Sequence, residues 1–432
     1  MIHVRDHYSG DWAAAVAAAV AAAGVAGGDM VAFPKGVTIT LASAVALPGN
    51  TTLLIPASCT IVKASGAYSH IFGLAVPTYP AYTQNVHIIG GTWRWNTTAD
   101  PGSDDERGFI LFKYGQGCSV RGGTFYGQNE SWPTRQTSGV SLSFCRDSSV
   151  SSATMYDTRQ GVAITANSAP DHDGRASDGC SVSGVAVTRA GTPAAYTSMG
   201  VQIQGSTGLA PEHVVTNVTV DRVTVSGAAM GVEFKKARRC TMKASTVTNM
   251  MMGLSATGAV ETVCEYNTFA SSPGAAPFDL SVEITGSPRS RVAGNSITHL
   301  AVKGVGVGAY ASTGLNSDDS WVGGNTINGA EDGIQLISGT SRCRASGNTI
   351  TGCTHGVKVG PTGSVGSATG DTLGNAVAAN AIDGCVTGVR VKRDGNYTAR
   401  DLRVSGNTIS ATTHILIDGG APPPGYVVRE SI

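Results

Sequence analysis

The 432-residue sequence predicts an all-β protein: a single parallel β-solenoid of about 12 or more coils behind an N-terminal capping α-helix. Three observations predict this fold. A short phrase recurs along the chain, as in GNTINGAEDGIQL from Gly324, GNTITGCTHGVKVG from Gly347 and ANAIDGCVTGVRV from Ala379. In six of the repeats, a glycine eight residues after the same position of this phrase opens a short strand of alternating residues. An alanine-rich segment near the N-terminus carries larger apolar residues at helical spacing.

The recurring phrase gives one anchor position in each coil. The anchors, at intervals of 22 to 38 residues, are Gly91, Gly123, Ala153, Val185, Val223, Ser245, Asn267, Asn295, Asn325, Asn348, Asn380 and Asn407. One coil cannot bury its apolar face alone, so successive coils must stack and share a core. A β-propeller would need four strands in each repeat of ~40–45 residues, and leucine-rich repeats would need leucines that this chain lacks.

The strands that follow the anchors read GVAIT, GVEFK, GLSAT, GIQLI, GVKVG and GVRVK. They begin at Gly161, Gly231, Gly253, Gly333, Gly356 and Gly388. Their alternation predicts one inward-facing and one outward-facing set of side chains. If Val232 and Phe234 face the core, Glu233 and Lys235 face outward.

Asparagine and cysteine recur at fixed places within the predicted coil. Asparagine fills the anchor in six successive coils, at Asn267, Asn295, Asn325, Asn348, Asn380 and Asn407. Stacked asparagines can hydrogen-bond to the neighbouring backbone and satisfy turn groups that would otherwise be buried unpaired. The nine cysteines include no CxxC pair, and Cys353 and Cys385 both lie five residues after an anchor. We therefore expect buried, reduced structural thiols rather than a zinc site or disulfides.

The segment SGDWAAAVAAAVAAAG predicts a helix that ends at Gly24. Ser9 or Asp11 can cap its N-terminus, because a side-chain oxygen there can accept from a free backbone N–H group. Trp12, Val16 and Val20 recur every four residues and form one apolar stripe.

The N-terminal segments VRDHYSGDWAAAVAAAVAAAG and GGDMVAFPKGVTI resemble the opening of the pectin-lyase-like superfamily, with a shortened aspartate-rich loop. This superfamily consists of right-handed parallel β-helices and includes many phage tailspikes and polysaccharide-degrading enzymes. The resemblance implies a right-handed coil whose open end is covered by the helix. We therefore predict an N-terminal segment with the cap helix over residues 1–30, a β-helix over 31–420 and a C-terminal tail over 421–432. Resemblance to tailspikes also implies a homotrimer.

Charge and hydropathy exclude several classes of function. Lys plus Arg and Asp plus Glu number 30 each, so the chain lacks the basic excess of a nucleic-acid or membrane-surface binder. No apolar run approaches the roughly 18 residues of a transmembrane helix. No signal peptide is recognisable. We expect a virion protein or an extracellular one, with a cytoplasmic location left open.

Polar residues recur at the outward position of one strand per coil. This file contains Gln202, Glu233, Ser255, Glu283, Gly306, Gln335, Lys358 and Arg390. Glu233 and Glu283 are two coils apart, which is ~9.5 Å between backbones. That spacing lies at the upper edge of the roughly 6.5–9.5 Å carboxyl separation of an inverting glycosidase, in which one carboxyl protonates the leaving oxygen and the other activates water. The alternative is two solvated glutamates on an exposed face.

Other residues of the same face are candidates for substrate binding. Gln202, Gln204 and Lys235 would contact sugar beside the carboxylates. Lys358 and Arg390 make one end of the file basic. This positive charge would suit an anionic polysaccharide, and the alternative is ordinary charge that keeps the surface soluble. The same alternation also exposes Ser281 and Thr285.

Two loops supply further candidates. Asp171, His172 and Asp173 lie in the charged segment NSAPDHDGRASDG and can form an acid–base group or hold Ca²⁺, or they belong to an ordinary surface turn. Trp132, in YGQNESWPTRQTSG, can stack on a sugar ring. Trp93 and Trp95 are expected in the core.

The combined prediction is a polysaccharide-binding and polysaccharide-degrading protein of the tailspike or depolymerase kind. Its catalytic residues would be drawn from Glu233, Glu283, Asp171, Asp173 and His172. It would need no cofactor, with Ca²⁺ at the Asp171 loop as the exception. The alternatives are a receptor-binding or structural virion subunit without catalysis, and a bacterial polysaccharide lyase or uronate epimerase.

Overall fold

The coil of this chain contains two short strands and one longer strand. The computed structural model describes residues 1–64, 70–75, 81–95, 108–127, 138–166, 176–189, 198–205, 214–270, 280–298, 303–308, 315–337, 339–360, 371–392, 399–418 and 425–429. The chain forms two compact units. Unit 1 is Met1–Gly191 with Thr197–Gly227, and unit 2 is Thr192–Tyr196 with Ala228–Ile432.

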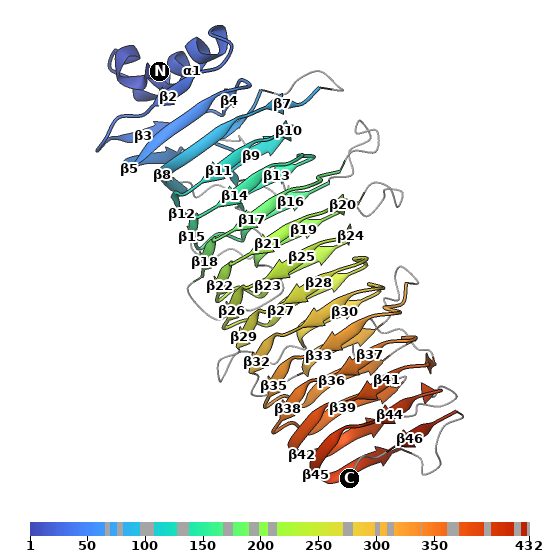
Figure 1. Ribbon diagram of the computed structural model, residues 1–432. Coiled ribbons are helices and arrows are strands. Elements are labelled where there is room, and N and C mark those ends of the chain that lie inside the picture. Colours follow the sequence, from blue (N-terminus) through green and yellow to red (C-terminus); the bar gives the residue numbers. More distant parts are fainter. Residues whose placement is uncertain are drawn as a thin grey trace. The chain divides into compact units, whose positions relative to one another are not determined.

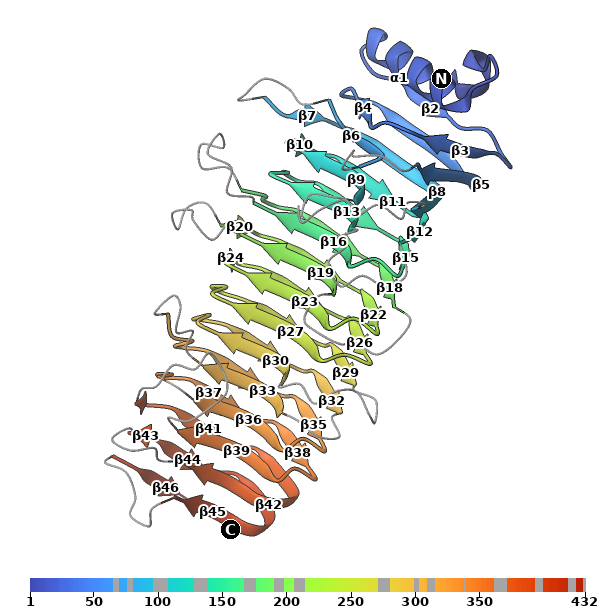
Figure 2. The same ribbon diagram turned by 180° about the vertical axis from the view of Figure 1, so that it is seen from behind.

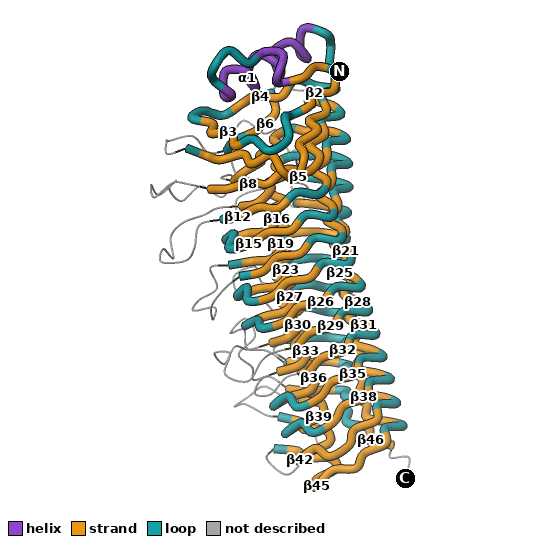
Figure 3. The backbone as a smooth tube through the Cα atoms, turned by 90° about the vertical axis from the view of Figure 1, so that its left-hand side faces the viewer, coloured by secondary structure: helices purple, strands orange, loops and turns teal. Residues whose placement is uncertain are grey.

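Each strand pairs in parallel with its counterpart in the next coil. One coil of unit 2 consists of β25 (Thr241–Lys243), β26 (Thr246–Thr248) and β27 (Met252–Thr257). Its partners are β28 (Val263–Glu265), β29 (Thr268–Ala270) and β30 (Leu280–Thr285). Strands of the three kinds therefore build a first sheet, a second sheet and a long-strand sheet. Figure 3 shows the second-sheet strands of unit 2 following one another. The predicted parallel β-solenoid is confirmed.

Unit 1 begins with the helical elements and continues as stacked coils. Its helices are η1 (Val4–His7) and α1 (Trp12–Val25). The first and second sheets contain β1 (Ile2–His3), β2 (Met30–Ala32), β3 (Thr38–Leu41), β5 (Thr52–Lys63), β8 (His87–Trp95), β11 (Ser119–Arg121), β12 (Thr124–Tyr126), β14 (Ser149–Ser151), β15 (Thr154–Tyr156), β17 (Ser181–Ser183), β18 (Ala186–Thr188), β21 (Thr219–Asp221) and β22 (Thr224–Ser226). The long-strand sheet contains β4 (Val45–Leu47), β6 (Phe72–Leu74), β9 (Gly108–Lys113), β13 (Ser138–Ser143), β16 (Gln160–Thr165) and β19 (Met199–Gln204). Short turn strands are β7 (Thr83–Gln84), β10 (Gly115–Gln116) and β20 (Val215–Thr216).

Unit 2 repeats the same coil. Its first and second sheets continue from β28 and β29 with β31 (Arg291–Ala293), β32 (Ser296–Thr298), β34 (Trp321–Gly323), β35 (Thr326–Asn328), β37 (Arg344–Ser346), β38 (Thr349–Thr351), β41 (Ala376–Ala378), β44 (Arg403–Ser405) and β46 (Val427–Arg429). The long-strand sheet contains β23 (Met230–Lys235), β27, β30, β33 (Lys303–Gly308), β36 (Asp332–Ile337) and β39 (His355–Gly360). Two longer strands, β42 (Ala381–Val391) and β45 (Thr408–Ile417), run through the second and long-strand sheets. Short turn strands are β24 (Ala237–Arg238), β40 (Thr372–Leu373) and β43 (Ala399–Arg400).

The capping helix forms nearly as predicted. Asp11 is the N-cap, and its side chain accepts a hydrogen bond from the backbone of Ala13 at 2.8 Å. Val16 and Val20 are buried together with the small residues Ala15, Ala19 and Ala23. The helix ends at Val25, one residue beyond the predicted end, and contacts β3 and β4 of unit 1.

In most long strands the second residue is a glycine, and the backbone of the next coil lies close to it. A Cβ atom on Gly356 would lie 2.6 Å from the carbonyl oxygen of Gly388, and one on Gly388 would lie 2.6 Å from that of His414. Ser281 occupies this same column, since its strand neighbours pair in register with those of Gly253. The prediction that Ser281 is exposed is wrong. Ser281 is fully buried, because a side chain in this column points inward, as the Cβ position of Gly253 beside the buried ring of Phe269 shows, so strict alternation begins only after it.

The asparagine ladder is confirmed in unit 2. The side-chain amide of each asparagine donates to the side-chain oxygen of the next at 2.8–3.0 Å, through Asn267, Asn295, Asn325, Asn348, Asn380 and Asn407. The same oxygen accepts the backbone N–H of the preceding asparagine. The residue before the asparagine often has a positive φ, as at Gly324 (65°) and Gly347 (67°), which glycine adopts without strain. The phrase GN is therefore a left-handed turn followed by an inward amide.

The other core predictions also hold. All nine cysteines are buried, and none forms a disulfide bond. Burial raises the pKa of Cys59 to about 11. Cys385 is different, since a hydrogen bond with Cys353 lowers its pKa below the usual thiol value. Trp93 and Trp95 lie in the core of unit 1, as expected.

The ladder predicts a large effect for one buried amide. Asn348→Ala removes the acceptor for the backbone of Asn325 and the donor to the carbonyl of Val322. Because each orphaned buried group costs about 1–3 kcal/mol, we expect the free energy of unfolding to fall by about 3 kcal/mol. Urea unfolding followed by circular dichroism measures this. The control is Asn328→Ala, at an exposed position of β35, which should change stability by less than about 0.5 kcal/mol. Equal effects of the two substitutions would contradict a ladder that stabilises the fold.

Candidate functional site

The outward file of polar residues lies on the long-strand sheet of unit 2. The register pairs Glu233, Ser255, Glu283, Gly306, Gln335, Lys358 and Arg390 in that order. Figures 1 and 2 show the strands that carry most of them, β23, β27, β30, β33, β36 and β39, side by side. The predicted register is therefore confirmed for this part of the file, including the continuation across the segment that precedes β30.

Glu283 is held by hydroxyl groups from its own strand and the preceding coil. Ser255 donates to Oε2 of Glu283 at 2.9 Å, and Thr285 donates to Oε1 at 3.0 Å. Glu233 lies on the other side of Ser255, one coil further back. The two glutamates are thus two coils apart, ~9.6 Å between backbones, with one serine hydroxyl between them. Hydrogen bonds from two hydroxyls stabilise the ionised form of Glu283.

These outward side chains are much less exposed than predicted. Glu233 is 6% exposed and Gln335 is fully buried. Glu283, Lys358 and Arg390 are half-buried. Side chains that follow one another at the strand spacing of ~4.8 Å pack against each other, so an outward direction does not make a residue solvated. The prediction of a freely exposed face is wrong for this sheet.

A second polar cluster, which we call the Asp332 network, lies further along the same sheet. Asp332, fully buried, has its Oδ1 2.6 Å from Nδ1 of His355 and its Oδ2 2.9 Å from Nζ of Lys358. Gln335 also donates to Oδ2. Nε2 of His355 lies 3.2 Å from Nη1 of Arg390. The network is thus built by three consecutive long strands, β36, β39 and β42.

The Asp332 network fixes the protonation of His355. Arginine can only donate hydrogen bonds, so Nε2 of His355 must accept from Arg390. The ring proton is therefore on Nδ1, where it is donated to Asp332. Arg390 is held on its other side by Asp418, at 3.1 Å between Nη2 and Oδ2. His355 is thus held between the carboxylate of Asp332 and the guanidinium of Arg390.

The carboxylate of Asp332 stays ionised despite its burial. Burial by itself would raise the pKa of Asp332. The hydrogen bond from His355, the charge of Lys358 and the hydrogen bond from Gln335 outweigh burial and hold this pKa well below its usual range.

The predicted glutamines of unit 1 form a hydrogen-bonded row. Ser138 donates to Gln160 at 2.7 Å, Gln160 donates to Gln202, and Gln202 donates to Gln204 at 2.7 Å. Gln202 is 4% exposed and Gln204 is half-buried. The prediction of exposed glutamines is therefore wrong for Gln202, whose amide is already engaged by its neighbours.

The remaining candidates fall into two groups. Lys235 is half-buried at the end of β23, in register with Thr257. Asp171, His172, Asp173 and Trp132 lie outside the described residues. Over the described ranges, no three His, Cys, Asp or Glu side chains are grouped so that they could hold a metal ion.

Sequence reasoning missed Asp332 and His355. A usable signal was present. The residue directly before the opening glycine is apolar at Met230 and Met252 and becomes ionisable at Asp332 and His355. The change from methionine to ionisable residues at one repeated position marks the part of the sheet where ionisable side chains replace apolar ones.

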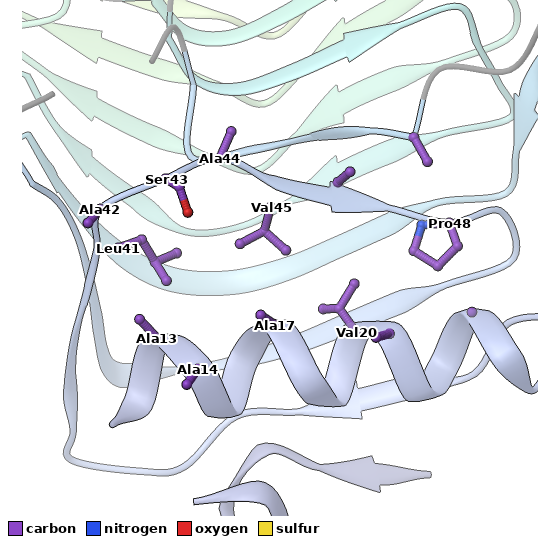
Figure 4. A pocket seen from close by; sticks show the side chains of 14 residues that line it. Ala13, Ala14, Ala17, Val20, Leu41, Ala42, Ser43, Ala44, Val45 and Pro48 are labelled. Atoms are coloured by element: carbon purple, nitrogen blue, oxygen red, sulfur yellow. The ribbon is translucent and has the colours of Figure 1, made fainter. Parts of the chain in front are cut away.

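An open groove of about 500 Å³ lies in unit 1 between α1 and the strands β3 and β4. Figure 4 shows Ala13, Ala17 and Val20 of the helix facing Leu41 and Val45 across it. Its lining is alanine, valine, leucine and proline with one serine, and no titratable group. The groove offers no chemistry of its own.

Comparison with known proteins supports the architecture. The family model described as right handed beta helix region matches residues 199–366. The solved structure of PfbA, a surface adhesin of Streptococcus pneumoniae, superposes with a TM-score of 0.59 at 15% identity, covering 91% of this chain and 93% of that one. The fold is a right-handed parallel β-helix. It is the fold of the pectin-lyase-like superfamily, so the resemblance seen in the sequence is confirmed at the level of fold.

Tailspikes are also similar to this β-helix. A mutant tailspike protein of E. coli bacteriophage HK620, in complex with a hexasaccharide, superposes with a TM-score of 0.61 at 14% identity, covering 99% of this chain and 80% of that one. Tailspike protein 3 of bacteriophage CBA120 gives a TM-score of 0.55 at 11% identity, covering 99% and 61%. No curated protein sequence matches the chain. Among the described residues, no helix is long and apolar enough to span a membrane.

The Asp332 network predicts a pH-dependent stability. Asp332→Asn should lower the free energy of unfolding by about 3 kcal/mol at neutral pH, because breaking a buried ion pair leaves its partners uncompensated. The native pKa of Asp332 is lowered, so its stabilisation is present above the unfolded value near 3.9 and is lost as the pH falls below it. The difference between wild type and variant should therefore narrow near pH 3. Urea unfolding at both pH values measures this, with exposed Asp383→Asn as the control. A difference that does not change with pH would contradict the ionised state of Asp332.

Proposed function

We propose that the long-strand sheet of unit 2 binds a polysaccharide and that Glu233 and Glu283 hydrolyse its glycosidic bonds with inversion. The observation that carries this proposal is the register of Glu233, Ser255 and Glu283 on three successive coils. At ~9.6 Å between backbones, the two carboxyl groups can flank a glycosidic bond and still leave room for a water.

The contacts of the two glutamates suggest their roles. Glu283 accepts hydrogen bonds from Ser255 and Thr285, which favour its ionised form, so it is the base that activates water. Glu233, on the other side of Ser255, is then the acid that protonates the leaving oxygen. Ser255 is a positioning residue, because it orients the base.

Several features support a glycan as the ligand. A tailspike of the same fold is in complex with a hexasaccharide. Lys235 lies at the edge of the same sheet, and Lys358 and Arg390 continue the file, which suits an anionic polysaccharide. In unit 1, the half-buried amide of Gln204 can hydrogen-bond to sugar hydroxyls. We also propose that Trp132 stacks on a sugar ring. Asp171, His172 and Asp173 would form an acid–base group or a Ca²⁺ site.

The biological setting follows from the same proposal. A protein of the tailspike or depolymerase kind would act on a virion or outside the cell, and it would assemble as a homotrimer. Light scattering of the purified chain tests the assembly, and a monomer at micromolar concentration would contradict it.

A second candidate function is favoured by the Asp332 network. Neutral His355, oriented by Asp332, can remove a proton next to a uronate carboxylate that Arg390 and Lys358 neutralise. This is the chemistry of a polysaccharide lyase or a uronate epimerase. A lyase leaves unsaturated sugar ends that absorb in the ultraviolet, and a hydrolase does not.

The decisive experiment tests purified protein against bacterial capsules, O-antigens and plant uronans. New reducing ends without ultraviolet absorbance are expected. Glu233→Gln and Glu283→Gln should each lower turnover by roughly 100-fold or more, because each removes a proton-transfer group. Ser255→Ala should lower kcat by roughly 10-fold with little change in KM, since it only disturbs the base.

The matched control is Glu265→Gln, on the first sheet, which should leave turnover unchanged. Unchanged turnover in both glutamate variants would contradict the assigned acid and base. Ultraviolet absorbance that is lost in His355→Gln would favour the lyase instead. Binding without either product would leave a receptor-binding or structural protein.

A further inference from the structure

A shallow pocket lies on the first sheet of unit 2, which is a different sheet from the one that carries Glu233 and Glu283. Its volume is about 400 Å³, and it is lined by residues of β34 and β37 and of the turns that precede them (β37 is labelled in Figures 1 and 2). Asp319, Ser320, Trp321, Arg342, Arg344 and Ser346 line it. Trp321 is half-buried on this outer strand, and Arg291 and Arg344 are its partners in register on the two neighbouring coils.

The indole ring of Trp321 is held in one orientation. Its Nε1 donates to Oγ of Ser346 in the next coil at 2.8 Å. The ring fills the space above Gly323, where a Cβ atom would lie 2.1 Å from Cζ2 of the ring. Ala293, Gly323, Ser346 and Ala378 follow one another in register beside the ring, so these four positions carry only small side chains. The ring is therefore a fixed apolar wall beside open space.

Cationic groups flank the ring on both sides. The guanidinium of Arg291, from the preceding coil, lies 4.6 Å from the ring centroid. Arg344, from the following coil, is exposed, and its guanidinium makes no hydrogen bond or ion pair with any described residue. Arg342 is fixed at the rim by a two-bond contact with Asp319, at 2.7 and 2.9 Å.

The balance of charge around the pocket is positive. Arg342 is neutralised by Asp319, and Arg291 is only loosely paired with Glu265 at 3.8 Å. Arg344 remains uncompensated within the described part of the chain. A ligand that carries one negative charge would neutralise Arg344. A carboxylate is suitable, because its two oxygens match the planar fork of a guanidinium.

We propose that this pocket, which we call the Trp321 site, is a binding site for a uronate residue of an anionic polysaccharide. The apolar C–H face of the sugar ring stacks on Trp321, and the carboxylate pairs with Arg344. The Trp321 site binds without cleaving, because its described lining offers no acid or base other than Asp319, which is paired with Arg342. The proposal goes beyond the hydrolysis proposed for Glu233 and Glu283 and does not depend on it.

The test measures binding of the full chain to polygalacturonate, alginate and hyaluronan, each compared with its carboxyl-reduced form, by affinity electrophoresis. The Glu283→Gln background keeps the polymers intact during the measurement. At least one native polymer should bind 10-fold or more tightly than its reduced form, because only the native form offers a carboxylate to Arg344. Trp321→Ala and Arg344→Gln should each remove most of that difference.

The control is Arg403→Gln, in the same file two coils further along and also exposed, but with alanine instead of tryptophan as its neighbour. It should bind like the parent. Since Arg344 is exposed, Arg344→Gln remains informative even if Trp321→Ala reduces stability.

Two results would overturn the Trp321 site: no preference for any native polymer over its reduced form, or unchanged binding in both Trp321→Ala and Arg344→Gln. The outcome is separable from catalysis. With the glutamates intact, Arg344→Gln should keep the kcat for short oligosaccharides, whereas Glu233→Gln should lose it. Failure of one proposal therefore leaves the other standing.

Discussion

The in-register stacking of coils within each unit determines the rest of the structure. Every coil repeats its path ~4.8 Å from the next, so each residue contacts the residues at its own position in the neighbouring coils. A buried polar group can then be satisfied by its own counterpart, as Asn325 and Asn348 are. Where the backbone of the next coil comes close, as at Gly356, no side chain fits. Both requirements explain why the same two residue types return at the same places.

Stacking also governs the outer face of the long-strand sheet. Side chains in one file are too closely spaced to be separately solvated, so polar residues there must bond to one another. Asp332 takes its donors from its own strand and from the next coil, and the chain of contacts continues through His355 to Arg390 and Asp418. An anion that displaced Asp418 from Arg390 would therefore also change the hydrogen bonding at His355. In this way the stacked coils connect an anion-binding group, Arg390, to a base, His355, in the preceding coil.

The repeat explains which features could be predicted from the sequence. The asparagine ladder and the register of Glu233, Ser255 and Glu283 follow from fixed offsets, which stacking preserves. The direction of Ser281 does not follow, because the second and third residues of the long strand are both buried, which breaks the period of two. The burial of Gln202 does not follow either, since it depends on neighbours in space. Asp332 and His355 do not follow from the alternation either, because they lie directly before the opening glycine and the alternating pattern starts after it.

The two candidate glycan surfaces of unit 2 make different physical demands. Catalysis requires groups that are stronger partners for the transition state than for the substrate, and the hydroxyls that hold Glu283 in place serve that requirement. A site that only binds needs a rigid surface and a matching charge, which Trp321 and Arg344 provide with little supporting structure. A polymer can occupy both, and once one is filled the second binding event becomes intramolecular, with an effective concentration that can reach the millimolar range. A weak, shallow site on a separate sheet is then sufficient to retain a long glycan, and it leaves the residues around Glu233 and Glu283 free to be selected for chemistry alone.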